Sequence, residues 1–100
     1  MDKKKKIEKI KEKLYEVIDP ELNISIVDLG LIYEIKLKDN KPYIKMTLTT
    51  IGCPLFSVIQ KEIENKLKEL GYNTTIIELT FDPPWSMDRL SERAKAILGI

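Results

Sequence analysis

"LIYEIKLKDNKPYIKMTLTT", residues 31–50, carries the clearest structural pattern in the chain. Apolar and charged side chains alternate through its first half, and side chains two residues apart lie on the same face of a β-strand. The first predicted strand begins at Leu31, and its apolar face carries Leu31, Tyr33, Ile35 and Leu37. The second predicted strand covers residues 43–50, and its apolar face carries Ile44, Met46 and Leu48. The polar turn "KDNKP" between the two strands predicts an antiparallel hairpin.

Helical patterns lie on both sides of this hairpin. Before it, apolar residues recur at steps of three and four and predict a helix that ends at Asp19-Pro20, because a residue before proline disfavours the helical conformation. The apolar stripe of this helix is Ile7, Ile10, Leu14, Val17 and Ile18. After the hairpin, a second helix is predicted from Pro54 to Leu70, and Gly71 suits the position that ends it. One side of the second helix carries Leu55, Val58, Ile59, Ile63, Leu67 and Leu70.

The rest of the chain adds an ordered loop, one strand and one helix. The loop is "DPELNISIVDLG", residues 19–30, and the β-branched run "TTIIELTF", residues 74–81, predicts a third strand. Ser86 is expected to cap a last helix that runs to Leu98. One face of that helix would carry Leu90, Ala94 and Ile97. The predicted fold class is α+β, a two-layer domain with the order α-β-β-α-β-α and a small, mostly antiparallel three-stranded sheet covered by helices.

Length and charge indicate a single, nearly neutral unit. The 100 residues fit one domain, residues 1–100, in which residues 1–6 form a basic tail or a frayed helix start. Lysine and arginine number 17 against 16 acidic residues, and the excess is largely the run "KKKK" at residues 3–6. We therefore expect no nucleic-acid partner. The abundance of Lys, Glu and Ile with few Gln is typical of thermophilic proteins.

Composition excludes several classes of chemistry. The chain has no histidine, so Ser-His and Cys-His dyads and histidine metal ligands are absent, and we expect that it is not an enzyme. Its single cysteine cannot form an internal disulfide. No apolar run approaches the roughly 20 residues of a membrane span or the core of a signal peptide. The sequence thus predicts a cytoplasmic protein with no membrane partner.

Cys53 is the strongest candidate for chemistry. Pro54 fits the first position of the second predicted helix, which places Cys53 beside the N-terminus of that helix. The helix dipole favours negative charge there, so we expect a lowered thiol pKa if Cys53 reaches solvent. The alternative is that Cys53 is a small apolar residue that fills the corner between strand and helix. Thr49 and Thr50, just before Cys53, also have two interpretations. They are either ordinary strand residues, or their hydroxyl groups are donors that orient a ligand held by Cys53.

Three further stretches carry candidate residues. Asp19 and Glu21 surround a proline in "DPEL", where they begin a turn or face a site. Asp28 in "VDLG" caps the turn before the first strand or points into a site, where it would contact a partner. Trp85 lies in the turn "FDPPWS", whose two prolines reduce the entropy lost on ordering. It is equally well explained as a lid over the core and as a contact for a partner.

Together these stretches resemble a known family. They occur in the order "DPEL" at residues 19–22, "DLGLIYEIKL" at 28–37, "MTLTTIGCPL" at 46–55, "DPPWS" at 82–86 and "LSERAKAILG" at 90–99. Over about residues 7–99 the chain resembles the SufT/PaaD-type family of metal-sulfur cluster biosynthesis proteins. The same domain occurs in cytosolic iron-sulfur assembly targeting factors and in some Mrp-type ATPases.

The resemblance implies an iron-sulfur cluster assembly-type domain that helps to mature iron-sulfur proteins. It implies that the motif residues border one cleft, and these residues are Asp19, Glu21, Thr49, Thr50, Cys53 and the loop of Trp85. Ile51 stands where similar sequences often have proline, so the loop is expected to be less rigid. The chain has neither the cysteine-rich tail of PaaD proteins nor the fused P-loop of the ATPases, and we expect neither a ring-hydroxylase role nor ATPase activity.

The number of thiols limits the mechanism. Common two- and four-iron clusters take four protein thiolates, whereas this chain has one, so no permanently bound cluster is expected. Cys53 would act transiently, by bridging a cluster across a homodimer with outside thiols or by presenting iron or cluster to a partner. Asp19 and Glu21 would supply oxygen ligands for iron or contact basic residues of a partner.

Two function classes remain open for the partners. In the first, the chain transfers iron or cluster between an iron-sulfur carrier or scaffold and apo-client proteins. In the second, it is an adaptor that holds no metal and links a P-loop carrier ATPase to apo-clients through the cleft and Trp85. A hydrolase or thiol transferase that uses Cys53 with Asp19 is disfavoured, because no base that titrates near neutral pH is present.

Overall fold

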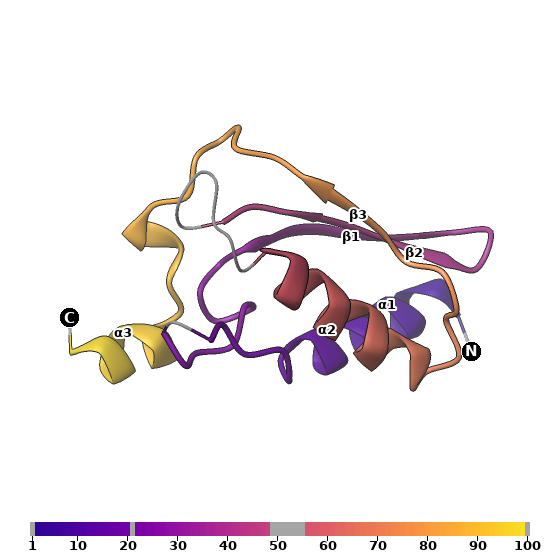
Figure 1. Ribbon diagram of the computed structural model, residues 1–100, viewed down its shortest axis with the longest axis horizontal. Coiled ribbons are helices and arrows are strands. Elements are labelled where there is room, and N and C mark those ends of the chain that lie inside the picture. The colour runs from indigo at the N-terminus through magenta and orange to yellow at the C-terminus, as the bar shows by residue number, and fades with distance from the viewer. Residues whose placement is uncertain (1, 21, 49–55, 100) are drawn as a thin grey trace.

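The computed structural model describes residues 2–20, 22–48 and 56–99. Its elements are α1 (Lys3–Leu14), β1 (Ile32–Lys38), β2 (Lys41–Met46), α2 (Phe56–Lys68), β3 (Ile76–Leu79), a short 3-10 helix (Met87–Arg89) and α3 (Glu92–Leu98). Helices α1 and α2 lie on one face of the three-stranded sheet, and α3 lies beyond one end of it (Figure 1). The predicted α+β class and element order are confirmed. No helix within the described ranges is long and apolar enough to cross a bilayer.

The sheet is mixed. β1 and β2 form the predicted antiparallel hairpin, and its two-residue turn, Asp39 and Asn40, has the positive φ values (50° and 60°) of a tight hairpin turn. β3 pairs with β2 in parallel, from Tyr43 opposite Ile76 to Met46 opposite Leu79. The prediction of a mostly antiparallel sheet is wrong for β3. Two parallel strands need a crossover connection, and α2 provides it by carrying the chain back along the sheet before β3 begins.

A β-bulge interrupts the alternation in β1. Ile32 pairs with Met46 and Glu34 with Lys45, so Tyr33 is the extra residue on the β1 side. A bulge bends its strand and redirects the bulged side chain. Leu31 and Leu37 are buried as predicted, whereas Tyr33 is only half-buried and does not continue their face.

The core lies between the sheet and the two long helices. Its buried members, with exposures of 9% or less, are Ile10, Leu14, Val17, Ile24, Ile26, Leu29, Leu31, Leu37, Ile44, Met46, Leu48, Ile59, Ile63, Leu67, Tyr72, Leu90 and Ala94. Most of them were placed on an apolar face by the sequence pattern. Three predicted members are exposed instead, since Ile18 is 43%, Val58 49% and Ile97 57% exposed.

Two helix boundaries differ from the predictions by more than two residues, and α2 ends at Lys68 rather than at Leu70. α1 ends at Leu14, four residues early, because Val17 accepts a backbone hydrogen bond from Ile26 and Ile18 pairs with Ser25 in an isolated bridge. Ile18 is consequently exposed. The Ser86 side chain makes no capping bond, and α3 begins only at Glu92.

The cap of α3 is Ser91, whose side chain accepts a hydrogen bond from the Ala94 amide. Leu90, in an extended conformation, separates α3 from the 3-10 helix.

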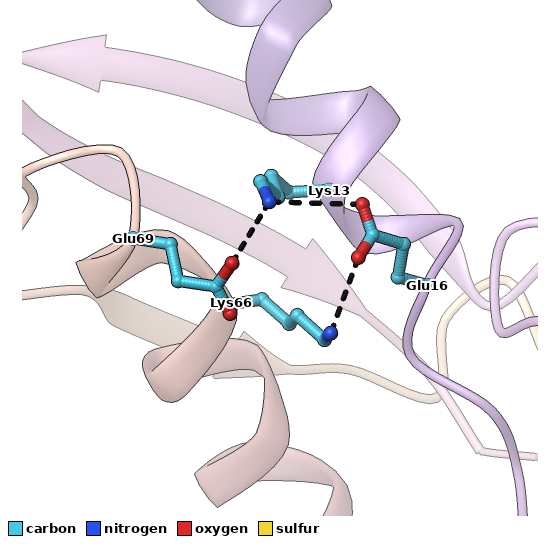
Figure 2. A network of polar contacts seen from close by, with 4 residues as sticks. All are labelled: Lys13, Glu16, Lys66 and Glu69. Carbon is cyan, nitrogen blue, oxygen red and sulfur yellow. Dashed lines mark hydrogen bonds and ion pairs between the residues drawn. The ribbon is translucent and has the colours of Figure 1, made fainter.

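A chain of ion pairs joins α1 to α2 (Figure 2). The Lys13 ammonium lies 2.9 Å from the Glu69 carboxylate and 3.8 Å from that of Glu16, which in turn lies 3.1 Å from the Lys66 ammonium. The hydrogen bond to Glu69 raises the pKa of Lys13 above its usual 10.5, and the same bond lowers the pKa of Glu69 below its usual 4.5. Because Lys13 contacts Glu69 and Glu16 contacts Lys66, the two helices run antiparallel.

This pair gives a pH-dependent contribution to stability. Because the pKa of Glu69 is lower in the folded state, its ionised carboxylate stabilises the fold at pH values above the usual carboxyl pKa. This contribution is lost as the pH falls through the lowered pKa. The raised pKa of Lys13 stabilises the fold below 10.5, and that contribution is lost as pH rises through the raised value. We expect Glu69→Gln to lower the urea midpoint near neutral pH. We expect no such loss at pH values below the lowered pKa of Glu69 or above the raised pKa of Lys13. The matched control, Glu62→Gln, alters an exposed α2 carboxylate that has no ion pair among the described residues, and an equal loss there would contradict the assignment.

Candidate functional site

The mixed sheet brings three loops to one end of the molecule. β1 begins where β2 and β3 end, and two backbone hydrogen bonds of 2.8 Å extend the sheet there, from the Thr47 amide to the Leu31 carbonyl and from the Thr80 amide to the Met46 carbonyl. We call this the motif end, comprising residues 19–20 and 22–31, which form the first loop, and residues 47–48 and 80–91 (Figure 1). The chain leaves β2 at this end before the segment 49–55. The topology therefore places "DPEL", "VDLG" and "DPPWS" at one end of the sheet.

Asp19 holds the first of these loops closed. Its carboxylate accepts a hydrogen bond from the Leu22 amide at 3.1 Å, and its carbonyl accepts one from the Asn23 amide at 2.7 Å. The Asp19 side chain is buried at 7% exposure. Since α1 ends at Leu14, Asp19 lies in the loop that follows the helix and not in its last turn. Glu21 lies outside the described residues.

Asp28 lies in the same loop as Asp19 and binds this loop to α3. Its carboxylate accepts a 2.9 Å hydrogen bond from the Ser91 hydroxyl, and its carbonyl accepts a 2.8 Å bond from the Ser91 amide. The same hydroxyl accepts a hydrogen bond from the Ala94 amide at 3.0 Å, so Asp28 also orients the cap of α3. Asp28 is 8% exposed, and its role as a partner contact stays a prediction.

Trp85 is half-buried against the core, and its indole Nε1–H donates a 2.7 Å hydrogen bond to the Leu29 carbonyl. Two side chains that the sequence analysis missed fix the same loop. The Tyr33 hydroxyl donates to the Pro83 carbonyl at 2.7 Å, and the Arg89 guanidinium lies 4.3 Å from the centre of the Tyr33 ring. Tyr33 is the bulged residue of β1, a position that the alternating pattern conceals.

An open groove of about 470 Å³ lies beside this loop. Its lining residues are Ile32, Tyr33, Glu34, Lys45, Asp82, Pro83 and Arg89. It combines an aromatic and aliphatic floor with both signs of charge, which suits a polypeptide segment better than a small molecule. A second hollow of about 340 Å³ lies over the strands themselves and contains none of the candidate residues.

The remaining candidates lie where the structure gives no description. Thr49, Thr50 and Cys53, together with Leu55 and the predicted first helical residue Pro54, fall within the segment 49–55. Among the residues described, no group of three or more acidic or cysteine side chains is arranged to hold a metal ion. Metal binding by Cys53 with Asp19 or Glu21 therefore stays a prediction.

Comparison with known proteins assigns the family. A family model described as iron-sulfur cluster assembly protein matches residues 7–78. The chain is 41% identical to the Fe-S protein maturation auxiliary factor YitW of Bacillus subtilis, with 93% of each chain covered. It is 40% identical to the Fe-S protein maturation auxiliary factor SufT of Staphylococcus aureus, with 84% of this chain and 98% of that protein covered.

A solved structure supports the same assignment. The crystal structure of a domain of unknown function, DUF59, from Bacillus anthracis superposes with a TM-score of 0.92 at 37% identity, covering 98% of this chain and 95% of that one. Sequence and fold thus agree over nearly the whole length. The chain belongs to the iron-sulfur cluster assembly protein family.

Proposed function

We propose that the chain is an auxiliary factor of iron-sulfur protein maturation that passes iron or a cluster to client proteins through Cys53. The observation that carries this proposal is the convergence of three motif loops on one end of the sheet, from which the chain enters the segment with its only thiol. The relatives at 40% and 41% identity bear names of the same activity.

The chemistry is an exchange of thiolate ligands. Iron, alone or within a cluster, is the cargo, and Cys53 supplies one soft ligand while the remaining ligands come from a second copy or from the donor protein. A client thiol loses its proton as it bonds to iron, and the Cys53 sulfur takes a proton as its bond to iron breaks. No electron is transferred in this exchange. A single protein ligand favours release, because the cargo is held weakly once its other ligands leave.

The described residues would present the client to this thiol. Tyr33 is bonded to Pro83 and carries Arg89 on its ring, so this wall of the groove is preorganised, and Trp85 is fixed beside it by its own bond to Leu29. Arg89 offers a positive charge that stacks on Tyr33 and has no carboxylate partner among the described residues, which suits an acidic group on a client. Asp19 is held in a closed turn on the same end of the sheet.

Anaerobic reconstitution tests the role of the thiol. We expect wild-type protein to take up iron and sulfide and to activate an apo-client, and we expect Cys53→Ser to lose both functions. Met87→Ser is the matched control, because it removes an exposed sulfur atom at the motif end that is not a thiol. Equal iron, sulfide and transfer in wild type and Cys53→Ser would refute the transfer mechanism.

The anchored Trp85 loop favours one alternative, an adaptor that binds a P-loop carrier ATPase and apo-clients without holding metal. Pull-down with apo-client separates the two functions. An adaptor keeps client binding in Cys53→Ser and loses it in Trp85→Ala. Trp85→Phe, which keeps an aromatic ring but lacks the Nε1–H donor to Leu29, shows whether anchoring of the loop or the ring surface matters. Transfer through Cys53 would instead be reduced in both Cys53→Ser and Trp85→Ala.

A further inference from the structure

The end of the molecule opposite the motif end gathers lysines from two separate elements. The first turn of α1 lies against the hairpin turn, and Lys3, Lys6, Leu37, Asp39 and Asn40 line one hollow of about 340 Å³. This end and the motif end lie at opposite ends of the 39 Å long axis (Figure 1). We call it the basic end, and its lysines are Lys3, Lys4, Lys5, Lys6, Lys38 and Lys41.

The basic end concentrates charge in a nearly neutral chain. Its six lysines face only two acidic residues, Asp2 and Asp39, which gives a local net charge of +4. The whole chain carries +1, so the remainder carries −3. All of these lysines except the half-buried Lys6 are exposed, and none has an ion pair with a carboxylate in the described part of the chain. The ion pairs of the described residues lie on other parts of the surface.

Two features of the basic end oppose local stability. The first turn of α1 holds lysines and no acidic residue, although the positive end of the helix dipole disfavours cations there, and the N-cap carboxylate of Asp2, which accepts from the Lys5 amide, offsets this cost in part. Lys38 and Lys41 lie directly opposite each other across the hairpin, and like charges in that position repel. The Lys38 ammonium lies 5.9 Å from the centre of the Tyr43 ring, which offsets only part of the repulsion. Local costs of this kind are typical of functional surfaces, since a bound anion would relieve them.

We infer that the basic end docks an acidic surface of a partner protein. Lysines are mobile, strongly hydrated point charges that attract carboxylates at long range without requiring a fixed geometry. Both arginines of the chain, which are the better ligands for phosphate, lie at Arg89 and Arg93, on the other side of the molecule. Among the exposed large hydrophobic side chains of the described residues, Ile76 alone shares a hollow with a lysine of the basic end, Lys38, whereas anchoring to a bilayer would require an apolar face. The inference does not depend on Cys53 or on the transfer mechanism.

Fluorescence anisotropy with a labelled oligoglutamate peptide tests the inference. We expect wild type to bind at low ionic strength and to release the peptide as salt screens the charges. Lys4→Glu/Lys41→Glu neutralises the basic end and should weaken binding about tenfold, the scale at which surface charge controls association. The matched control, Lys61→Glu/Lys68→Glu, makes the same change in net charge at exposed lysines of α2 and should weaken it by about twofold at most.

Stability provides a second readout. Lys41→Glu replaces the repulsion with Lys38 by an attraction and should raise the urea midpoint while it weakens peptide binding. Undetectable binding by wild type, or equal weakening in the two double variants, would overturn the inference. Tighter binding of wild type to single-stranded oligothymidylate or to phosphatidylserine vesicles than to oligoglutamate would overturn the assignment to an acidic protein surface.

Discussion

Gly30→Ala is expected to lower the free energy of unfolding by about 3 kcal/mol. Gly30 has a φ of +76°, a conformation that costs an alanine roughly 1–2 kcal/mol. A Cβ at this position would also overlap the backbone carbonyl and the Cβ of Arg89. The backbone of the 3-10 helix cannot move away without disturbing the Tyr33 contact, so overpacking adds roughly 1–3 kcal/mol.

Gly99→Ala is the matched control for this variant. Its φ is also +76°, but nothing lies within 4 Å of the added Cβ, so the expected loss is only about 1 kcal/mol. Urea unfolding gives both values. The fluorescence of Trp85, which bonds to the carbonyl of the residue before Gly30, should change in Gly30→Ala and not in Gly99→Ala. Equal losses in the two variants would show that the contact with Arg89 is not restrictive.

Ile59→Ala should cost about 3 kcal/mol of unfolding free energy, through lost burial and the cavity that remains. Ile59 is 1% exposed on the side of α2 that faces the sheet, within the main core. Its neighbour Val58 is 49% exposed on the same helix, so Val58→Ala should change stability by no more than about 0.5 kcal/mol.

The two adjacent truncations share a helix and differ chiefly in burial. Chemical unfolding of both variants, with helicity followed by circular dichroism, measures the difference directly. The sequence pattern assigns both residues to the apolar side of this helix, whereas the structure assigns only Ile59 to the core. Similar losses in both variants would contradict the position of α2 on the sheet.

Much of the fold could be predicted because its signals are local. The alternation in residues 31–38, the turn at Asp39 and Asn40 and the helical spacing around Ile63 each reflect a period of one element. Helix ends were less predictable, because tertiary pairing decides them. Backbone bonds from the Ile26 amide to Val17 and from the Asp19 amide to Ile24 take the chain out of α1, and the bond from Ser91 to Asp28 fixes where α3 begins.

The candidate site was predictable only as a set of motifs. Sequence patterns and the family resemblance identified Asp19, Asp28 and Trp85, and the structure assigns each of these an internal hydrogen bond. They did not identify Tyr33 or Arg89, since a bulge and a cation–π contact between residues 56 positions apart leave no local pattern. Parallel pairing of β3 was equally hidden, and it is the feature that brings the loops together.

That parallel pairing also affects how the chain can assemble. Hairpin partners Lys38 and Lys41 are three residues apart in sequence, whereas Tyr43 and its β3 partner Ile76 are 33 apart. Closing the longer loop costs about 2 kcal/mol more chain entropy, which the four-residue β3 offsets only when α2, the helix that joins the two strands in sequence, packs on the sheet. The loop of Trp85, which follows β3, therefore joins the motif end late in folding, and a fragment without α2 would lack the complete candidate site.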